Sequence, residues 1–275
     1  MLKAYKPTTQ SRRKMTVTDY SCLTRRAPEK SLVKPKSKIS GRDKLGHISV
    51  RHRGGAEKRK YRIITSLDKH LKLKAIVEQL EYDPNRSAFI VLVKFEDDQK
   101  GYLLAWDKVQ VGDEVIADDK AEVKKGNRMR VKNIPNGIGI FDIEIQPTQG
   151  SRMVRSAGTV ATIVAKEGDY VHVKLPSGEI RKVNKNSFAS IGQVSNLTHS
   201  FQRIGKAGRM RHMGVRPSVR GKAMHPAAHP HGGGEGVNSI GLKYPKTPWG
   251  KHALGVRTRK KNKYSASLII ARRKK

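Results

Sequence analysis

The sequence predicts a mostly β protein in which two small β-barrels lie between extended basic arms. Lysine and arginine outnumber aspartate and glutamate by 18 to 4 in residues 1–60, by 21 to 18 in residues 61–197 and by 19 to 1 in residues 198–275. Short β-forming runs separated by turn signals fill the nearly neutral middle. Both flanks are too polar and too rich in glycine and proline to build a core. We therefore expect a basic arm over residues 1–60, barrels over 61–125 and 126–197, and a short helix with a second basic arm over 198–275.

The first barrel is predicted from three strand-like runs. Alternating side chains from Leu71 to Tyr82 suit a half-buried strand. The segment Asp83-Pro84-Asn85-Arg86 should end it in a turn, because proline fixes φ and asparagine tolerates the left-handed region. Residues 88–93 and 101–106 provide two further strands. Short strands at this spacing fit an oligonucleotide/oligosaccharide-binding (OB-like) barrel, a fold used for nucleic acid.

The second barrel is predicted from five short strands with tight turns. They are expected at residues 129–134, 139–145, 159–165, 170–175 and 179–183. In the fourth of these, Val171, Val173 and Leu175 alternate with polar or aromatic neighbours, as in a strand with one buried face. Five such strands fit an SH3-like barrel, although periodicity alone does not force either barrel type.

One helix is expected after the barrels. Asn196 could cap it, and Leu197, Phe201 and Ile204 would share one face before Gly205 ends it. No periodicity continues beyond Gly205, so the remaining chain is expected to be an extended arm whose shape its partner sets.

The charge distribution points to a polyanionic partner. The three segments have net charges of +14, +3 and +18, and nucleic acid supplies enough phosphates to neutralise them. Cys22, the only cysteine, excludes an internal disulfide and a cysteine-based zinc site. No apolar run approaches the roughly 18 residues of a membrane span, and Met1–Pro7 lacks the apolar core of a secretory signal. We expect a reducing compartment that contains nucleic acid, no membrane partner and no homo-oligomer.

A histidine- and glycine-rich segment, residues 216–236, carries the sharpest local signal. One interpretation is a zinc site. Its ligands would be His225, His229, His231 and Glu235. Pro226 and Pro230 argue against it, because they forbid the helix that would place the first two histidines on one face.

The same segment could act in acid–base catalysis or bind RNA. His229 would titrate near neutral pH, but no nucleophile with an orienting carboxylate lies nearby, and Glu235 is the only acid of the arm. Gly232–Gly234 lack Cβ atoms, so the backbone can approach sugars and phosphates. Arg220 and Lys222 would contact phosphate, and the imidazoles would donate or stack. RNA binding is therefore the favoured interpretation.

The expected RNA contacts extend beyond this segment. Trp249 offers a stacking platform or, alternatively, anchors the arm on a barrel. Arg152 and Arg155 could face phosphate from a strand edge, or lie in a solvated loop. The complete predicted set is Arg51, His52, Arg53, Gly54, Gly55, Arg86, Arg152, Arg155, Arg216, Arg220, Lys222, His229, His231, Gly232, Gly233, Gly234 and Trp249. No residue is assigned to catalysis or to a metal.

Several of these motifs resemble the universal protein numbered two of the large ribosomal subunit. The matching segments are Leu80–Ala88, Arg155–Thr159, Gly214–Pro217, Val219–Gly221, His229–Gly236 and Thr247–Gly250. The likeness runs in order from Tyr5-Lys6-Pro7 to the basic C-terminus, and the longer motifs are specific. A transit peptide is therefore not expected before Tyr5.

The resemblance implies an OB-like barrel, an SH3-like barrel and two arms threaded into large-subunit rRNA in a cytoplasmic ribosome. It implies further partners, namely neighbouring ribosomal proteins and small-subunit rRNA at an intersubunit contact. In that family the loop around His229 approaches the peptidyl-transferase region. RNA performs the catalysis there, so the protein is expected to be structural. No cofactor is expected, although zinc, or structural magnesium held through RNA, stays an alternative.

The chain also departs from the family pattern, which bears on the RNA contacts. Ala56 and Glu57 stand where a glycine and a histidine are usual, and His225 and Ala228 stand where asparagine and aspartate are usual. Two other protein classes compete. A DNA-compacting protein would share the charge but not the barrels, and a metal-dependent nuclease would need clustered carboxylates, whereas these acids are scattered.

Overall fold

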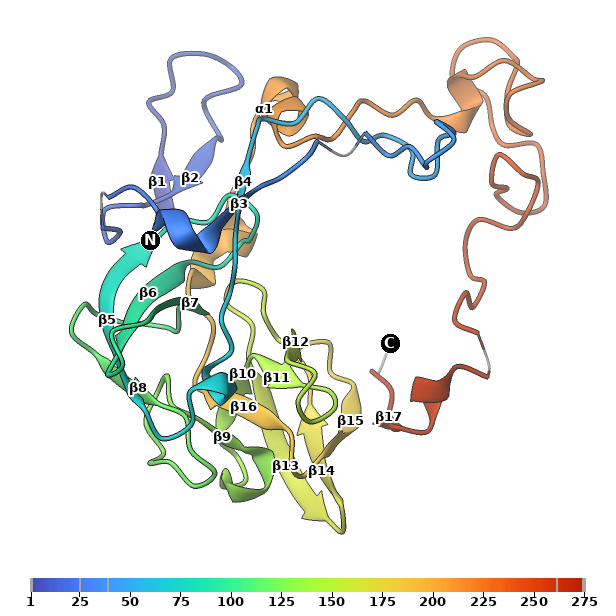
Figure 1. Ribbon diagram of the computed structural model, residues 1–275. Coiled ribbons are helices and arrows are strands. Elements are labelled where there is room, and N and C mark those ends of the chain that lie inside the picture. The colour runs from blue at the N-terminus through green and yellow to red at the C-terminus, as the bar shows by residue number, and fades with distance from the viewer. Residues whose placement is uncertain (1, 25, 39, 261, 274–275) are drawn as a thin grey trace. The chain divides into compact units, whose positions relative to one another are not determined.

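The computed structural model describes residues 2–24, 26–38, 40–260 and 262–273, and it is mostly β (Figure 1). The chain forms two compact units. The first, here called the sheet unit, comprises Met1–Ser37, Lys58–Lys206 and Ser267–Lys275. The second, the loop unit, comprises Lys38–Glu57 and Ala207–Ala266. The sheet unit thus contains part of each predicted basic arm together with both predicted barrels. The domain boundaries expected at residues 60, 125 and 197 remain predictions.

A four-stranded antiparallel sheet occupies the region of the predicted first barrel. In the order β7–β6–β5–β8 its strands are Lys100–Leu104, Ile90–Phe95, Lys74–Glu81 and Glu114–Ile116. The first three confirm the strands expected from alternation and turn signals. Val77, Val91, Phe95 and Trp106 contribute to its core and are almost fully buried, which supplies the main hydrophobic stabilisation.

A seven-stranded sheet occupies the region of the predicted second barrel. In the order β17–β15–β14–β13–β10–β16–β9 its strands are Ile269–Ala271, Ile180–Asn184, Tyr170–Lys174, Ala161–Glu167, Gly139–Phe141, Phe188–Ile191 and Arg128–Arg130. Val171 and Val173 lie in its core, as their alternation predicted. Within the described residues neither sheet closes by pairing its two edge strands.

Short antiparallel pairs complete the sheet unit. They are β1 (Leu2–Ala4) with β2 (Thr16–Thr18), β3 (Val33–Pro35) with β4 (Lys60–Arg62), and β11 (Ile143–Glu144) with β12 (Ser151–Met153). Three short strands of the predicted N-terminal arm are therefore paired, β1 with β2 and β3 with β4. No helix in the described part of the chain is long and apolar enough to span a membrane.

The helix expected from Asn196 to Ile204 is present only in part, as a short 3₁₀ helix. A 3₁₀ turn, Leu197–Phe201, stands there, and the only α-helix among the described residues is α1, Ala207–His212. Capping needs an extended backbone, whereas Asn196 is left-handed (φ 61°) and makes no side-chain cap hydrogen bond; its Nδ2 instead donates to the Ser87 carbonyl at 2.7 Å.

A buried ionic cluster connects β9 with neighbouring loops of the sheet unit. The Arg128 side chain is 1% exposed and forms an ion pair with Asp68. It also donates to the Asp142 carbonyl (2.7 Å) and to Ser151 Oγ (2.8 Å). Burial tends to raise the pKa of Asp68, but the Arg128 charge and the hydrogen bonds outweigh it and hold that pKa below its ordinary value. Burial raises the pKa of the neighbouring Glu144, which acts as a hydrogen-bond partner of Asp68.

Candidate nucleic-acid interface

A short antiparallel ladder in the loop unit joins residues 52–57 to residues 212–216. Arg216 N donates to the His52 carbonyl (3.0 Å), and Gly54 N donates to the Gly214 carbonyl (3.1 Å). His52 and Gly54 both have positive φ, which lets the chain bend at this point. The ladder brings together two segments that are far apart in the sequence and that were each predicted to contact RNA.

The ladder lines a cationic cavity of about 460 Å³. Four arginines contribute to its wall, namely Arg42, Arg51, Arg53 and Arg216. With no carboxylate among its described lining residues, the cavity attracts anions. Guanidinium groups offer planar, paired donors that suit phosphate oxygens. Arg42 was not predicted, because it reaches the cavity through a hairpin closed by an isolated bridge between Arg42 and Ile48.

An aromatic platform lies in the same unit. Trp249 is 73% exposed, and the Arg51 guanidinium lies 5.2 Å from its ring centroid. An exposed indole held beside a cation can stack on a base, and the cation adds attraction to phosphate. The exposure favours the stacking interpretation of Trp249 over a buried anchor.

His229 is the one buried residue of the predicted histidine–glycine site, at 7% exposure. Its Nδ1 accepts the His231 backbone N–H (3.0 Å), so its proton is on Nε2 whenever the ring is neutral. His231 Nε2 in turn accepts the Lys246 backbone N–H (2.9 Å). Partial burial, followed by the charges of His229 and Lys222, lowers the pKa of His231. Both imidazoles therefore brace the backbone of this segment.

Two glycines of this segment are required by close internal packing. A Cβ on Gly221 would lie 2.5–2.6 Å from three atoms of the His229 ring, and one on Gly232 would lie 2.5 Å from the His225 carbonyl oxygen. Sequence reasoning assigned the triple glycine to close approach of RNA and missed this internal use. The need for glycine at position 221 follows from its closeness to the His229 ring in the folded chain, which the sequence does not show.

No group of three or more histidine, cysteine, aspartate or glutamate residues that could hold a metal exists in the described ranges. In the residues considered for zinc, His225 Nδ1 accepts the Ala227 backbone N–H (3.2 Å). His229 and His231 also use one ring nitrogen each as an acceptor, as described above. The ring nitrogens that a zinc site would need thus accept hydrogen bonds from backbone N–H groups instead.

The predicted basic residues divide into engaged and exposed side chains. Arg86 Nε donates to the fully buried Asp83 (2.7 Å), so this guanidinium stabilises its own turn. Arg155 Nε lies 2.9 Å from Asp142 Oδ1. Arg152, on β12, and Arg220 are exposed, and the Lys222 ammonium donates to the Asn238 carbonyl. Exposed guanidinium groups are the better candidates for phosphate, and the RNA contacts of all five remain predictions.

Ala56 and Glu57, which differ from the usual family residues, make contacts across the ladder. His212 Nδ1 and Glu57 Oε1 lie 2.6 Å apart, and the Glu57 N–H donates to the His212 carbonyl (3.1 Å). The methyl group of Ala56 faces Gly214, where an added Cβ would lie 2.9 Å away. This side-chain pair therefore adds to the ladder beside the cationic cavity.

Glu57→Gln should increase the affinity for rRNA about two- to fivefold at moderate salt. The variant keeps a hydrogen-bonding side chain but removes the only carboxylate on the ladder, and the gain should shrink as salt screens it. Filter binding at two salt concentrations measures it. Glu179→Gln, in a turn of the sheet unit, is the matched control; an equal gain there would show that only net charge matters.

The fold and the site define a basic, β-rich protein built to bind nucleic acid through arginines and exposed backbone. Comparison with family models matches residues 29–117 to the RNA binding N-terminal domain of Ribosomal Proteins L2. Residues 124–250 match the C-terminal domain of the same family. The chain therefore belongs to the ribosomal protein L2 family, which confirms the resemblance seen in the motifs. The OB-like and SH3-like descriptions of the two sheets fit these two domains.

Proposed function

We propose that this chain is a structural rRNA-binding protein of the large ribosomal subunit that supports subunit association, tRNA placement and the architecture of the peptidyl-transferase region. The family establishes a ribosomal RNA-binding protein, and the cavity with four arginines beside an exposed tryptophan supports RNA binding through the loop unit. Its further partners are neighbouring ribosomal proteins and small-subunit rRNA. Its place is the cytoplasmic ribosome.

The proposed role is supporting rather than catalytic. His229 is buried, and its Nδ1 is occupied by a backbone N–H. A general base must reach the proton that it abstracts, and an orienting carboxylate usually holds it. The contacts of His229 are instead those of a residue that fixes the shape of a loop, which presents Arg220 and neighbouring backbone groups to RNA.

Binding to rRNA should be steeply salt-dependent and should rely on the cationic cavity. Replacing Arg42, Arg51 and Arg216 together by glutamine should reduce the magnitude of the slope of log K against log salt by about 0.7–0.9 for each phosphate that is no longer neutralised, a total of about two to three. Titrations of large-subunit rRNA fragments at several salt concentrations measure this slope.

Lys100→Gln provides the matched control, because the Lys100 ammonium already pairs with Glu78 at 2.9 Å. Its slope should equal that of the parent. An unchanged slope in the triple variant would contradict the assignment of this cavity to rRNA phosphates.

A further inference from the structure

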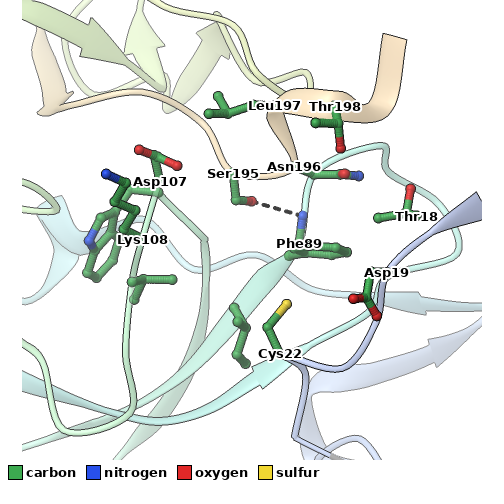
Figure 2. Close-up of a pocket in the computed structure, with 13 residues that line it drawn as sticks. Thr18, Asp19, Cys22, Phe89, Asp107, Lys108, Ser195, Asn196, Leu197 and Thr198 are labelled. Carbon is green, nitrogen blue, oxygen red and sulfur yellow. Dashed lines mark hydrogen bonds between the residues drawn. The ribbon is translucent and has the colours of Figure 1, made fainter. Parts of the chain in front are cut away.

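A second cavity, of about 250 Å³, lies within the sheet unit (Figure 2). The N-terminal segment after β2, the loop after β7 and the chain around the 3₁₀ turn Leu197–Phe201 enclose it. Leu80, Phe89 and Trp106 form apolar parts of its wall, and each is less than 10% exposed. Polar and charged residues make up the rest of the lining, so the cavity combines apolar contact area with groups that can orient a ligand.

The charge of this cavity is opposite to that of the rest of the molecule. Asp19 and Asp107 line it with one lysine, Lys108, and no arginine is present among its described lining residues. In Figure 2 the two carboxylates appear at opposite ends of the view. The Ser21 backbone N–H donates to Asp19 Oδ1 (3.0 Å) and lowers the pKa of Asp19, so this carboxylate is charged at neutral pH. Such a wall repels phosphate, in contrast to the cavity with four arginines.

One residue of the cavity wall also has a buried hydrogen-bond acceptor without a partner. Asn196 lines it, and its Oδ1 is buried without a hydrogen-bond partner in the described part of the chain, whereas its Nδ2 is held by Ser87. A buried acceptor left unpaired is unfavourable by about 1–3 kcal/mol. Two carboxylates beside apolar side chains are complementary to a cationic donor with a hydrocarbon stem, which describes arginine and lysine.

We propose that this cavity receives an arginine or lysine side chain, with an apolar neighbour, from a basic segment of an adjacent protein in the ribosome. The inference rests on the proposed ribosomal function and adds a protein contact to it. The stem would pack against the apolar wall, and the charged head would lie between the carboxylates. The opposite signs of the two cavities separate a protein-binding site from the RNA-binding one.

Cys22 provides the probe, because it is exposed, is the only cysteine and lines the cavity. The chain is labelled there with a benzophenone maleimide, incorporated into large subunits and irradiated. We expect a conjugate that protease destroys and ribonuclease leaves intact, joined to a peptide that contains arginine or lysine beside an apolar residue. Asp19→Asn with Asp107→Asn should reduce its yield about three- to tenfold, and Glu179→Gln should not.

Three results would overturn the proposal. The first is a conjugate that only ribonuclease removes, and the second is a protein conjugate whose yield is unchanged when both aspartates are replaced. The third is a yield no higher than that obtained from a Cys22→Ser, Ser177→Cys protein, which carries the label on an exposed turn. Failure of the unlabelled chain to enter large subunits would instead contradict the ribosomal function itself.

Native Cys22 gives a second measurement that needs no label during assembly. Its alkylation by N-ethylmaleimide, followed by mass spectrometry, should be at least about tenfold slower in assembled subunits than in the free protein. An unchanged rate would show that the cavity stays open and would contradict the inference, even if the labelled chain failed to assemble.

Discussion

Arg128→Met should lower the free energy of unfolding of the sheet unit by about 3–5 kcal/mol, because it leaves buried carboxylates without their counter-charge. Methionine fills much of the space, so the decrease reports charge and hydrogen bonds rather than a cavity. In the parent, the guanidinium pairs with Asp68 and donates to the Asp142 carbonyl and Ser151. Urea unfolding followed by Trp106 fluorescence, in a Trp249→Phe background, measures the difference.

Arg130→Met is the matched control on the same strand. Its side chain is 30% exposed and pairs with the exposed Asp119, so its removal should change stability by about 0–1 kcal/mol. Equal decreases in the two variants would contradict the idea that burial makes Arg128 critical.

The difference in stability between the two proteins should shrink as pH falls towards about 5. The lowered pKa of Asp68 in the parent gives stability that is present above the ordinary carboxyl pKa and is lost as pH falls. In Arg128→Met the buried Asp68 carboxylate lacks its partner, so its pKa should rise above the ordinary value. Acidification towards about pH 5 should then stabilise the variant, whereas a parallel decline in both would contradict the account.

Gly221→Ala should displace the His229 imidazole and impair assembly of the chain into active large subunits. The new methyl group would lie 2.5–2.6 Å from three ring atoms, and neither the ring nor the backbone can move without disturbing the His231 contact. Overpacking of this kind is unfavourable by about 1–3 kcal/mol, which corresponds to roughly a 5- to 150-fold disadvantage in competition with the parent for incorporation. Mass spectrometry of mixed reconstitutions measures that ratio.

Gly208→Ala is the matched control, because Gly208 lies in α1 with nothing within 4 Å of an added Cβ. Alanine favours a helix, so this variant should compete as well as the parent.

For Gly221→Ala ribosomes that do assemble, peptide formation should fall by a pH-independent factor between about pH 6 and 9. Disappearance of a titration near neutrality would indicate that His229 acts as an acid or base.

Local patterns predicted those parts of the fold that depend on neighbours in sequence. Strands β5 and β6 follow from alternation and from the turn at Asp83, whose carboxylate also holds Arg86. The helix expected at Asn196 is only a short 3₁₀ helix, because the Asn196 backbone is left-handed and its side chain bonds Ser87, 109 positions away, and no local signal reports such a contact. Tertiary contacts override a capping preference of about 1 kcal/mol.

The candidate site shows the same division. Basic and glycine-rich motifs identified most of the residues that line the cationic cavity, because composition alone marks phosphate binding. Arg42 and the pairing of Glu57 with His212 were missed, since both depend on how two distant segments meet. The aspartate-lined cavity was also missed, because no local pattern indicates that Asp19 and Asp107 lie on the same cavity wall.

The edge strand β17 has a consequence for the order in which a ribosome is built. Ile269–Ala271 pairs with β15, so the chain that leaves the sheet unit after Lys206 returns to it. Residues 207–266 are therefore a loop held at both ends and not a free C-terminal tail. A loop held at both ends cannot pass end-first through RNA that has already formed its tertiary contacts. If rRNA surrounds this segment, as proposed above, we expect the protein to bind while β17 is paired and before that part of the RNA completes its tertiary structure.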